Sequence, residues 1–129
     1  MKRPWRVRLG SRSRAAGRLA EVWAAAWLMA KGYQVLGFRL KNRVGEIDLL
    51  ARRGDVLAVV EVKRRATLDQ ALTALSDTQK SRLMAAGRAV ARNRPSLKSL
   101  SLRLDMVALA PGRFPRHVRG LSQESLRRS

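Results

Sequence analysis

Five of the nine acidic residues in this 129-residue chain stand inside apolar segments: Glu21, Glu46, Asp48, Glu61 and Asp105. An ionised carboxylate among apolar neighbours is costly unless it is paired with a cation or binds a metal ion. The other four acids suit a turn, a loop, a helix cap and the C-terminal segment, and they are Asp55, Asp69, Asp77 and Glu124. The placement of the first five acids is therefore the first indication of chemistry.

Four of the chemically useful side chains fall in two strand-like segments, Gly45-Glu46-Ile47-Asp48 and Glu61-Val62-Lys63. Because side chains alternate along a strand, Glu46 and Asp48 share one face, as do Glu61 and Lys63. A hairpin with an even-length loop turns all four to the same face. Placing Ala51 opposite Val56 predicts that Asp48 lies opposite Val59 and diagonal to Glu61, near enough for the two carboxylates to share one cation.

Metal-assisted hydrolysis of a phosphodiester is the chemistry that suits this set. Mg²⁺ prefers oxygen ligands, often one or two carboxylates together with substrate phosphate, and we expect Mn²⁺ to substitute for it. The metal ion would polarise a phosphoryl oxygen and lower the pKa of its bound water, while Lys63 orients that water or stabilises the added negative charge. The alternative at this point is a pair of surface salt bridges on a half-exposed sheet face, each worth little.

The charge balance indicates a polyanionic partner. The chain has 28 Lys and Arg against nine Asp and Glu, a formal net charge of +19, and every phosphate that a basic residue neutralises releases counterions. Genomic base composition is an alternative source of part of this excess, since only six of the basic residues are Lys. The chain has no Cys and one His, which excludes disulfides, thiolate zinc sites, a Cys nucleophile and sites with paired His ligands.

One α/β domain, 13–121, is expected between a basic N-terminal arm, 1–12, and a flexible basic tail, 122–129. Hydrophobic periodicity, caps and turn residues predict the order helix, three strands, helix, strand, in a mixed central sheet flanked by helices. The expected ranges are helices at 13–31 and 76–93, strands at 33–40, 46–52, 56–63 and 102–110, a helical turn near 70–75 and a short strand near 117–121.

The apolar run 22–30 lies within the first predicted helix. It is too short for the about 20 residues that a membrane span needs. Lys31-Gly32-Tyr33 follows it instead of a small-residue cleavage site, which argues against an export signal. We therefore expect a cytoplasmic protein without a membrane partner.

Spacing also predicts which other side chains are buried. Trp23 and Trp27 fall on one stripe of the first helix, and we expect both to pack in the core. Glu21 falls on the neighbouring, largely apolar stripe. For Asp105 we expect a buried ion pair with an Arg, with a supporting role in the site as the alternative. His117 has no partner of ligand type at helpful spacing, so we expect a surface or packing residue.

The motifs Gly45-Glu46-Ile47-Asp48 and Val60-Glu61-Val62-Lys63, in this order and at this separation, resemble those of the PD-(D/E)xK nuclease superfamily. More narrowly, the chain resembles the YraN-like family of uncharacterised bacterial proteins, which are similar to archaeal Holliday-junction resolvases. The likeness extends from about residue 17 to about residue 110 and includes a helix with a Glu, a second helix and an Arg-x-Asp strand. It implies a restriction-endonuclease-like core.

The resemblance implies Asp48 and Glu61 as metal ligands, Lys63 as the catalytic lysine and Glu21 as an additional catalytic acid. It also implies a supporting role for Glu46. In the second helix the family tends to have Lys-Gln, whereas this chain has Gln79-Lys80, and helical spacing favours Gln79 as the one that faces the site. The basic residues expected to contact nucleic acid are Arg12, Arg14, Arg43, Arg64 and Arg65.

The leading hypothesis is a Mg²⁺-dependent endonuclease-like protein that acts on DNA, including branched or structured forms. Junction-cutting relatives work as dimers, so a homodimer stays open, although the sequence indicates no dimer surface. A second hypothesis is a nucleic-acid-binding module that keeps the nuclease-like fold without turnover. A third is a basic protein associated with RNA or the ribosome.

Overall fold

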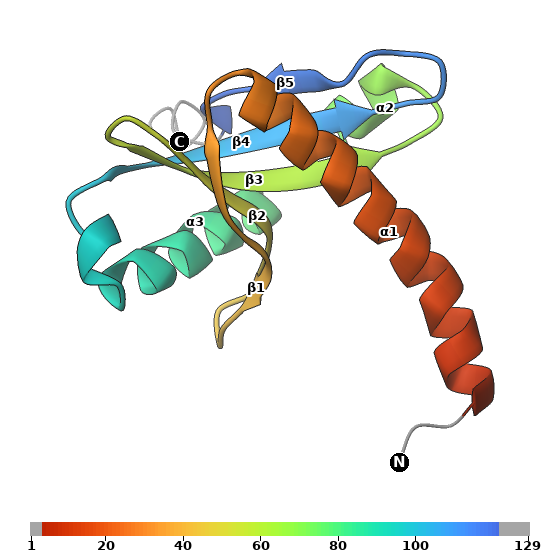
Figure 1. Ribbon diagram of the computed structural model, residues 1–129, viewed down its shortest axis with the longest axis horizontal. Helices are drawn as coiled ribbons and strands as arrows, with labels where there is room; N and C mark the ends of the chain where they lie inside the picture. Colours follow the sequence, from red (N-terminus) through yellow and green to blue (C-terminus); the bar gives the residue numbers. More distant parts are fainter. Residues whose placement is uncertain (1–3, 122–129) are drawn as a thin grey trace.

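The chain starts with a long helix, continues into three strands and returns to the same sheet after a helical segment (Figure 1). The computed structural model describes the backbone of residues 4–121 and the side chains of residues 17–121. Its elements are α1 (Pro4–Ala30), β1 (Gln34–Lys41), β2 (Glu46–Arg53), β3 (Val56–Arg64), α2 (Leu68–Leu72), α3 (Asp77–Arg92), the 3₁₀ helix η1 (Pro95–Leu97), β4 (Ser101–Leu109) and β5 (Arg116–Val118). The predicted order of the main elements is confirmed.

The strands form one mixed sheet in the order β1-β2-β3-β4-β5. Only β3 and β4 are parallel, because the chain crosses over through α2 and α3 between them. In Figure 1, α1 crosses one face of the sheet and α3 covers the other. Each face has its own apolar core, with Ala24 and Leu28 of α1 in one and Leu83 and Ala86 of α3 in the other. The predicted restriction-endonuclease-like α/β class is confirmed.

Small residues on α1 let it approach the sheet closely. Ala24 and Leu28 are fully buried, whereas Trp23 is 60% exposed. The prediction that Trp23 packs in the core is wrong, because Ala24 and Leu28 occupy the face of the helix that meets the sheet. Trp27 is half-buried and stacks on Phe114, with 6.1 Å between the ring centroids.

Helix ends follow local sequence signals. At the end of α1, Gly32 has φ +92°, the left-handed conformation of a glycine cap. At the start of α3, Ser76 and Gln79 form the predicted capping box. The start of α1 differs from the prediction, since it lies at Pro4 instead of residue 13. Proline suits the first turn of a helix, and the Arg, Leu and Ala that follow are good helix formers, so the expected arm is largely helical.

Two smaller elements are also displaced from their predicted ranges. The connecting helix α2 begins at Leu68, ahead of residue 70, because the Oγ1 of Thr67 caps it by accepting a hydrogen bond from the backbone N of Gln70. The last strand, β5, spans Arg116–Val118 instead of 117–121.

The β2–β3 hairpin is tighter than predicted. Arg53 pairs with Val56, and Leu49 pairs with Val60, so placing Ala51 opposite Val56 was wrong by two residues. Gly54 has φ +60°, which a two-residue hairpin loop requires and glycine adopts without strain. Extending this register by one residue puts Asp48 directly opposite Glu61 instead of diagonal to it.

Candidate functional site

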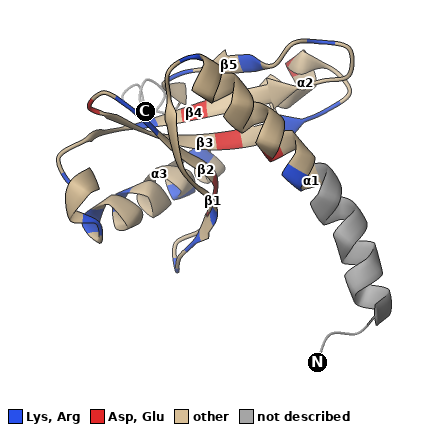
Figure 2. Ribbon diagram, in the orientation of Figure 1, with Lys and Arg blue, Asp and Glu red and all other residues tan. Residues whose placement is uncertain are grey.

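A hollow of about 420 Å³ opens between α1 and the neighbouring ends of β2 and β3. Its lining includes all four residues predicted to be catalytic, namely Glu21, Asp48, Glu61 and Lys63. Glu21 comes from α1, Asp48 from the start of β2, and the other two from the end of β3. Figure 2 shows the acidic segment of β3 close to α1. We call this hollow the α1-side hollow.

The two strands stop pairing where the acids lie. The backbone ladder between β2 and β3 ends at Leu49 and Val60. Beyond that point, Oδ2 of Asp48 accepts a hydrogen bond from the backbone N of Val62 at 2.9 Å. The carboxylate thus takes the place of a strand acceptor and is anchored at the end of the ladder. Glu61, beside it, lines hollows on both sides of the sheet.

The charges at the strand end are close and only partly balanced. Nζ of Lys63 lies 3.1 Å from Oε2 of Glu61, and both side chains are mostly buried. Burial, together with the charge of Glu61, raises the pKa of Asp48 to about 7, although the hydrogen bond from Val62 acts in the opposite direction. Two carboxylates therefore share one lysine, an arrangement that a further cation would relieve.

Glu21 is buried and has its own basic partner. Its Oε1 accepts a hydrogen bond from Nε of Arg39 at 2.9 Å. Arg39 lies beyond a bulge in β1 and has φ +52°, the one positive φ of a residue other than glycine between positions 4 and 121. Such a conformation is costly and persists when surrounding contacts hold it. Sequence reasoning missed Arg39, because one more Arg in a strand of a basic chain carries no distinguishing signal.

The predicted supporting residues lie on the α3 side of the sheet. Glu46 and Gln79 line a hollow of about 170 Å³ that also includes Glu61. Glu46 does not line the α1-side hollow, so the prediction that all four strand side chains share one face is met only in part. Of the neighbouring pair Gln79-Lys80 in α3, Gln79 lines this second hollow, whereas Nζ of Lys80 lies 3.5 Å from Oδ1 of Asp77. Gln79 also closes the capping box through its Oε1.

The predicted nucleic-acid contacts fall in three places. Arg64 and Arg65 are exposed and line the α1-side hollow, where their positive charge could attract phosphate. Arg43 is exposed in the loop between β1 and β2 and lines neither hollow. The side chains of Arg12 and Arg14 lie outside the described residues.

His117 belongs to a buried polar network. Its Nε2 lies 2.8 Å from Oδ2 of Asp105, and its Nδ1 lies 2.6 Å from Nζ of Lys31. Its side chain is 1% exposed, so of the two expected alternatives it is a packing residue, and its polar contacts were not predicted. The sequence conceals the contact because Lys31 directly follows α1, far from His117 along the chain, and only the fold brings the two residues together.

Asp105 is the centre of this network. Arg103 donates two hydrogen bonds of 2.8 Å to its carboxylate, which confirms the predicted buried ion pair with an Arg. Burial acts to raise the pKa of Asp105, but the hydrogen bonds from His117 and Arg103 hold it below its usual value. Asp105 and His117 line neither hollow of the site. The network therefore joins β4, β5 and the end of α1.

The donor set at the strand end suits a hard divalent cation. Asp48 and Glu61 offer carboxylate oxygens, and burial beside Glu61 raises the pKa of Asp48. Within residues 17–121 no group of three or more acidic, His or Cys side chains is arranged to hold a metal ion. Mg²⁺ is commonly bound by one or two carboxylates and completes its shell with water and substrate phosphate. The two carboxylates therefore fit Mg²⁺ or Mn²⁺.

A family model described as uncharacterised protein family UPF0102 matches residues 20–109, which include all four residues of the α1-side hollow that were predicted to be catalytic. The chain belongs to the UPF0102 family. The UPF0102 protein of Caulobacter vibrioides strain NA1000 is 58% identical over 109 residues, which cover 84% of this chain and 87% of that protein. The UPF0102 protein of Paramagnetospirillum magneticum is 50% identical over 106 residues, 79% of this chain and 82% of that protein.

The resemblance to the YraN-like family is thereby confirmed at the level of the family. The match covers the strand hairpin, α3 and β4 of this UPF0102 protein but begins after Arg12 and Arg14. In the part of the chain that the structure describes, no helix combines the length and the apolar character needed to cross a membrane.

Proposed function

We propose that this UPF0102 protein is a Mg²⁺-dependent phosphodiester hydrolase that cuts DNA, including branched or structured forms. One observation carries the proposal: Asp48 and Glu61 meet where the β2–β3 ladder ends, with Nζ of Lys63 3.1 Å from Oε2 of Glu61. Burial, together with the charge of Glu61, raises the pKa of Asp48, which supports a site that takes up a cation. A divalent cation and a phosphate together would complete the balance.

Each side chain has a role that follows from its place. Asp48 and Glu61 would hold the metal ion, which supplies Lewis-acid activation of the phosphate and a bound water of lowered pKa. The hydrogen bond from Val62 fixes the direction of the Asp48 carboxylate. Lys63 is near enough to orient the attacking water or to stabilise the added negative charge on phosphate. Glu21, held by Arg39, can accept a hydrogen bond from a water in the same hollow.

The decisive experiment is a cleavage assay on linear, nicked, flapped and four-way DNA with Mg²⁺ or Mn²⁺. Wild type should cut at least one of these substrates. Lys63→Ala and Asp48→Asn should each lower the rate about 100-fold or more, the order of magnitude for removing one group that stabilises developing charge. Lys98→Ala is the matched control, because Lys98 is exposed beside η1 and lines neither hollow. Failure of folded wild type to cut any of the substrates would overturn the proposal.

A specific observation also favours a second candidate, a nucleic-acid-binding module without turnover. Two of the three carboxylates in the α1-side hollow already have a basic partner within the protein, since Lys63 pairs with Glu61 and Arg39 with Glu21. Such a module would bind nucleic acid with a steep salt dependence that Lys63→Ala leaves unchanged. Calorimetry with Mn²⁺ separates the two candidates, because only a metal site makes wild type and Asp48→Asn differ. Preference for RNA in the same binding assay would indicate a ribosome- or RNA-associated protein.

A further inference from the structure

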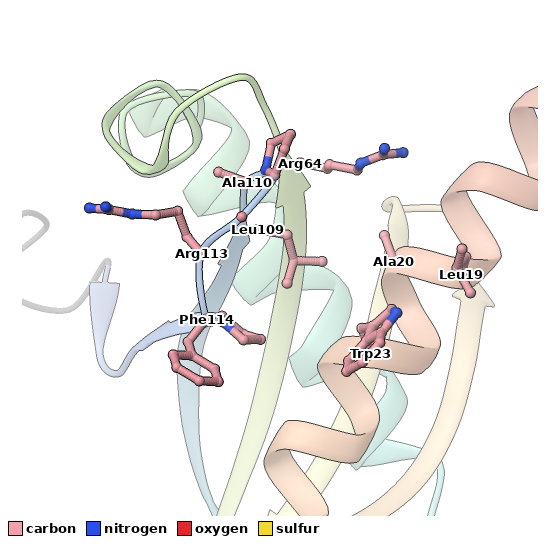
Figure 3. Close-up of a pocket in the computed structure, with 11 residues that line it drawn as sticks. Leu19, Ala20, Trp23, Arg64, Leu109, Ala110, Arg113 and Phe114 are labelled. Carbon is pink, nitrogen blue, oxygen red and sulfur yellow. The ribbon is translucent and has the colours of Figure 1, made fainter.

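An apolar groove of about 490 Å³ lies beside the candidate site, between α1 and the loop that joins β4 to β5. Trp23 of α1 and Phe114 of the loop stand on its two sides, with Leu109 of β4 between them (Figure 3). Its volume is within the about 300–1,000 Å³ typical of small-molecule pockets. The sequence motifs of the proposed function do not include any of these residues.

The walls of this groove are unusually open to solvent for aromatic side chains. Trp23 is 60% exposed and Phe114 is 81% exposed, and Leu19 on the same wall is 59% exposed. Single exposed apolar residues are ordinary, but a contiguous group of them marks a binding surface. Phe114 stacks on Trp27, a contact that favours the orientation in which its ring stands at the wall of the groove.

The groove is continuous with the α1-side hollow. Ala20 and Arg64 line both cavities. Arg64 extends its guanidinium from the end of β3 toward the side on which α1 lies, whereas Arg113 points away from the groove (Figure 3). A strand whose phosphate lies in the α1-side hollow would therefore pass Arg64 and bring its neighbouring nucleotide to the aromatic walls.

We propose that this groove binds unpaired nucleobases, by stacking them on Trp23 and Phe114, next to the position where the backbone is cut. Every base has an aromatic face, so stacking tolerates any sequence. Bases inside a duplex already stack on one another and cannot enter, whereas bases in a flap, gap or branch can. The inference rests on the proposed function and narrows its substrate to DNA with a single-stranded segment beside the cut.

Binding is measured with fluorescently labelled duplexes that carry a single-stranded flap, in EDTA so that no cutting occurs. Trp23→Ala and Phe114→Ala should each weaken binding about 5- to 150-fold, the range for loss of one base–aromatic stack. Phe38→Ala is the matched control, because Phe38 is also an exposed aromatic residue, 45% exposed, but lies on β1 outside the groove. It should leave the affinity unchanged.

A flap of abasic sugar-phosphate separates stacking from charge. It keeps the phosphates but has no bases, so wild type should bind it less tightly than the normal flap. Trp23→Ala keeps only the Phe114 ring for stacking, so it should discriminate less between the two flaps. Circular dichroism confirms that each variant is folded, as expected for side chains this exposed. Equal affinity of wild type and both groove variants for the normal flap would overturn the inference.

Other occupants of the groove have distinct outcomes. Sedimentation that shows a dimer in wild type and a monomer in Trp23→Ala would assign the groove to a second copy of the chain and overturn the inference. A third outcome concerns the fluorescence of the Trp residues. If adding a flap leaves this fluorescence unchanged but deleting residues 122–129 alters it, the groove would be assigned to the C-terminal segment and the inference overturned. Finally, suppose that wild type cuts flapped and plain duplex DNA at the same rate, and that Trp23→Ala cuts plain duplex as fast as wild type does. That result would leave the proposed function standing and overturn only this inference.

Discussion

Replacing Asp48 with Asn should stabilise the metal-free protein, although most substitutions at partly buried polar positions destabilise. Burial and the charge of Glu61 raise the pKa of Asp48 from 3.8 to about 7. Between these two pH values the unfolded chain has lost the proton that the folded state still binds. Stability of wild type therefore falls as the pH rises through this window, and it does not recover above it. Asn carries no charge and removes this dependence.

The size of the effect follows from the same pKa. A rise from 3.8 to about 7 corresponds at most to about 4 kcal/mol of unfolding free energy above pH 8. Asn keeps an oxygen that can accept the hydrogen bond from the backbone N of Val62, but it gives up the attraction between Asp48 and Lys63. We therefore expect Asp48→Asn to gain about 1–3 kcal/mol at pH 8 and almost nothing near pH 4.

Urea unfolding from pH 4 to pH 9 in EDTA, followed by tryptophan fluorescence, measures this gain. Asp55→Asn is the control, because Asp55 is exposed in the β2–β3 turn and its replacement should change stability by less than about 0.5 kcal/mol. Adding Mg²⁺ at ten times its dissociation constant should then stabilise wild type by about 1.4 kcal/mol and Asp48→Asn by much less. The prediction would be refuted if the Asn variant were less stable than wild type at pH 8, or if its stability varied with pH in parallel with that of wild type. Either result would mean that Asp48 is not destabilised by burial beside Glu61.

Three further predictions concern the scaffold, and each is checked by urea or thermal unfolding. Asp105→Ala should lower the free energy of unfolding by about 3 kcal/mol at pH 7, because it leaves Arg103 and His117 without their buried acceptor. The pKa of Asp105 is held below 3.8, so wild type should keep this stabilisation above about pH 4 and lose it in stronger acid. Gly87→Ala should lower the free energy of unfolding by about 1–3 kcal/mol in spite of the helix propensity of Ala, because the new Cβ would lie 2.5 Å from Cγ2 of Val59. In a background that already carries Val59→Ala, the same substitution should cost less. Ser76→Ala should cost about 1 kcal/mol by removing the cap of α3, and faster hydrogen exchange at the amide of Gln79 should accompany it.

The order of elements could be predicted because each carries a strong local signal. The strand segments of β2 and β3 are short apolar runs on either side of a glycine turn, and the capping box of α3 is visible in four residues. The register of the hairpin was less accessible, since loops of two and four residues both keep the acids on one face. The conformation of Gly54, which the spacing of apolar residues does not reveal, selects the two-residue loop.

The residues that sequence reasoning missed are those whose partners are distant along the chain. Arg39 contacts Glu21 only because β1 runs beside α1, and His117 contacts Lys31 only because β5 adds to the edge of the sheet. The exposure of Trp23 could not be predicted from the sequence for a related reason. Helical spacing defines stripes but not which stripe faces the sheet, and here the stripe of small residues allows the closer approach.

If the proposed function holds, metal ion and substrate should bind to the site cooperatively. A phosphate placed among Asp48, Glu61 and Glu21 without a cation would add negative charge to carboxylates of which one, Asp48, already has a raised pKa. A divalent cation placed there without phosphate would face Arg64, Arg65 and the paired Lys63. Each ligand therefore improves the electrostatic environment of the other, and by linkage the metal raises the affinity for DNA by the same factor as DNA raises the affinity for the metal.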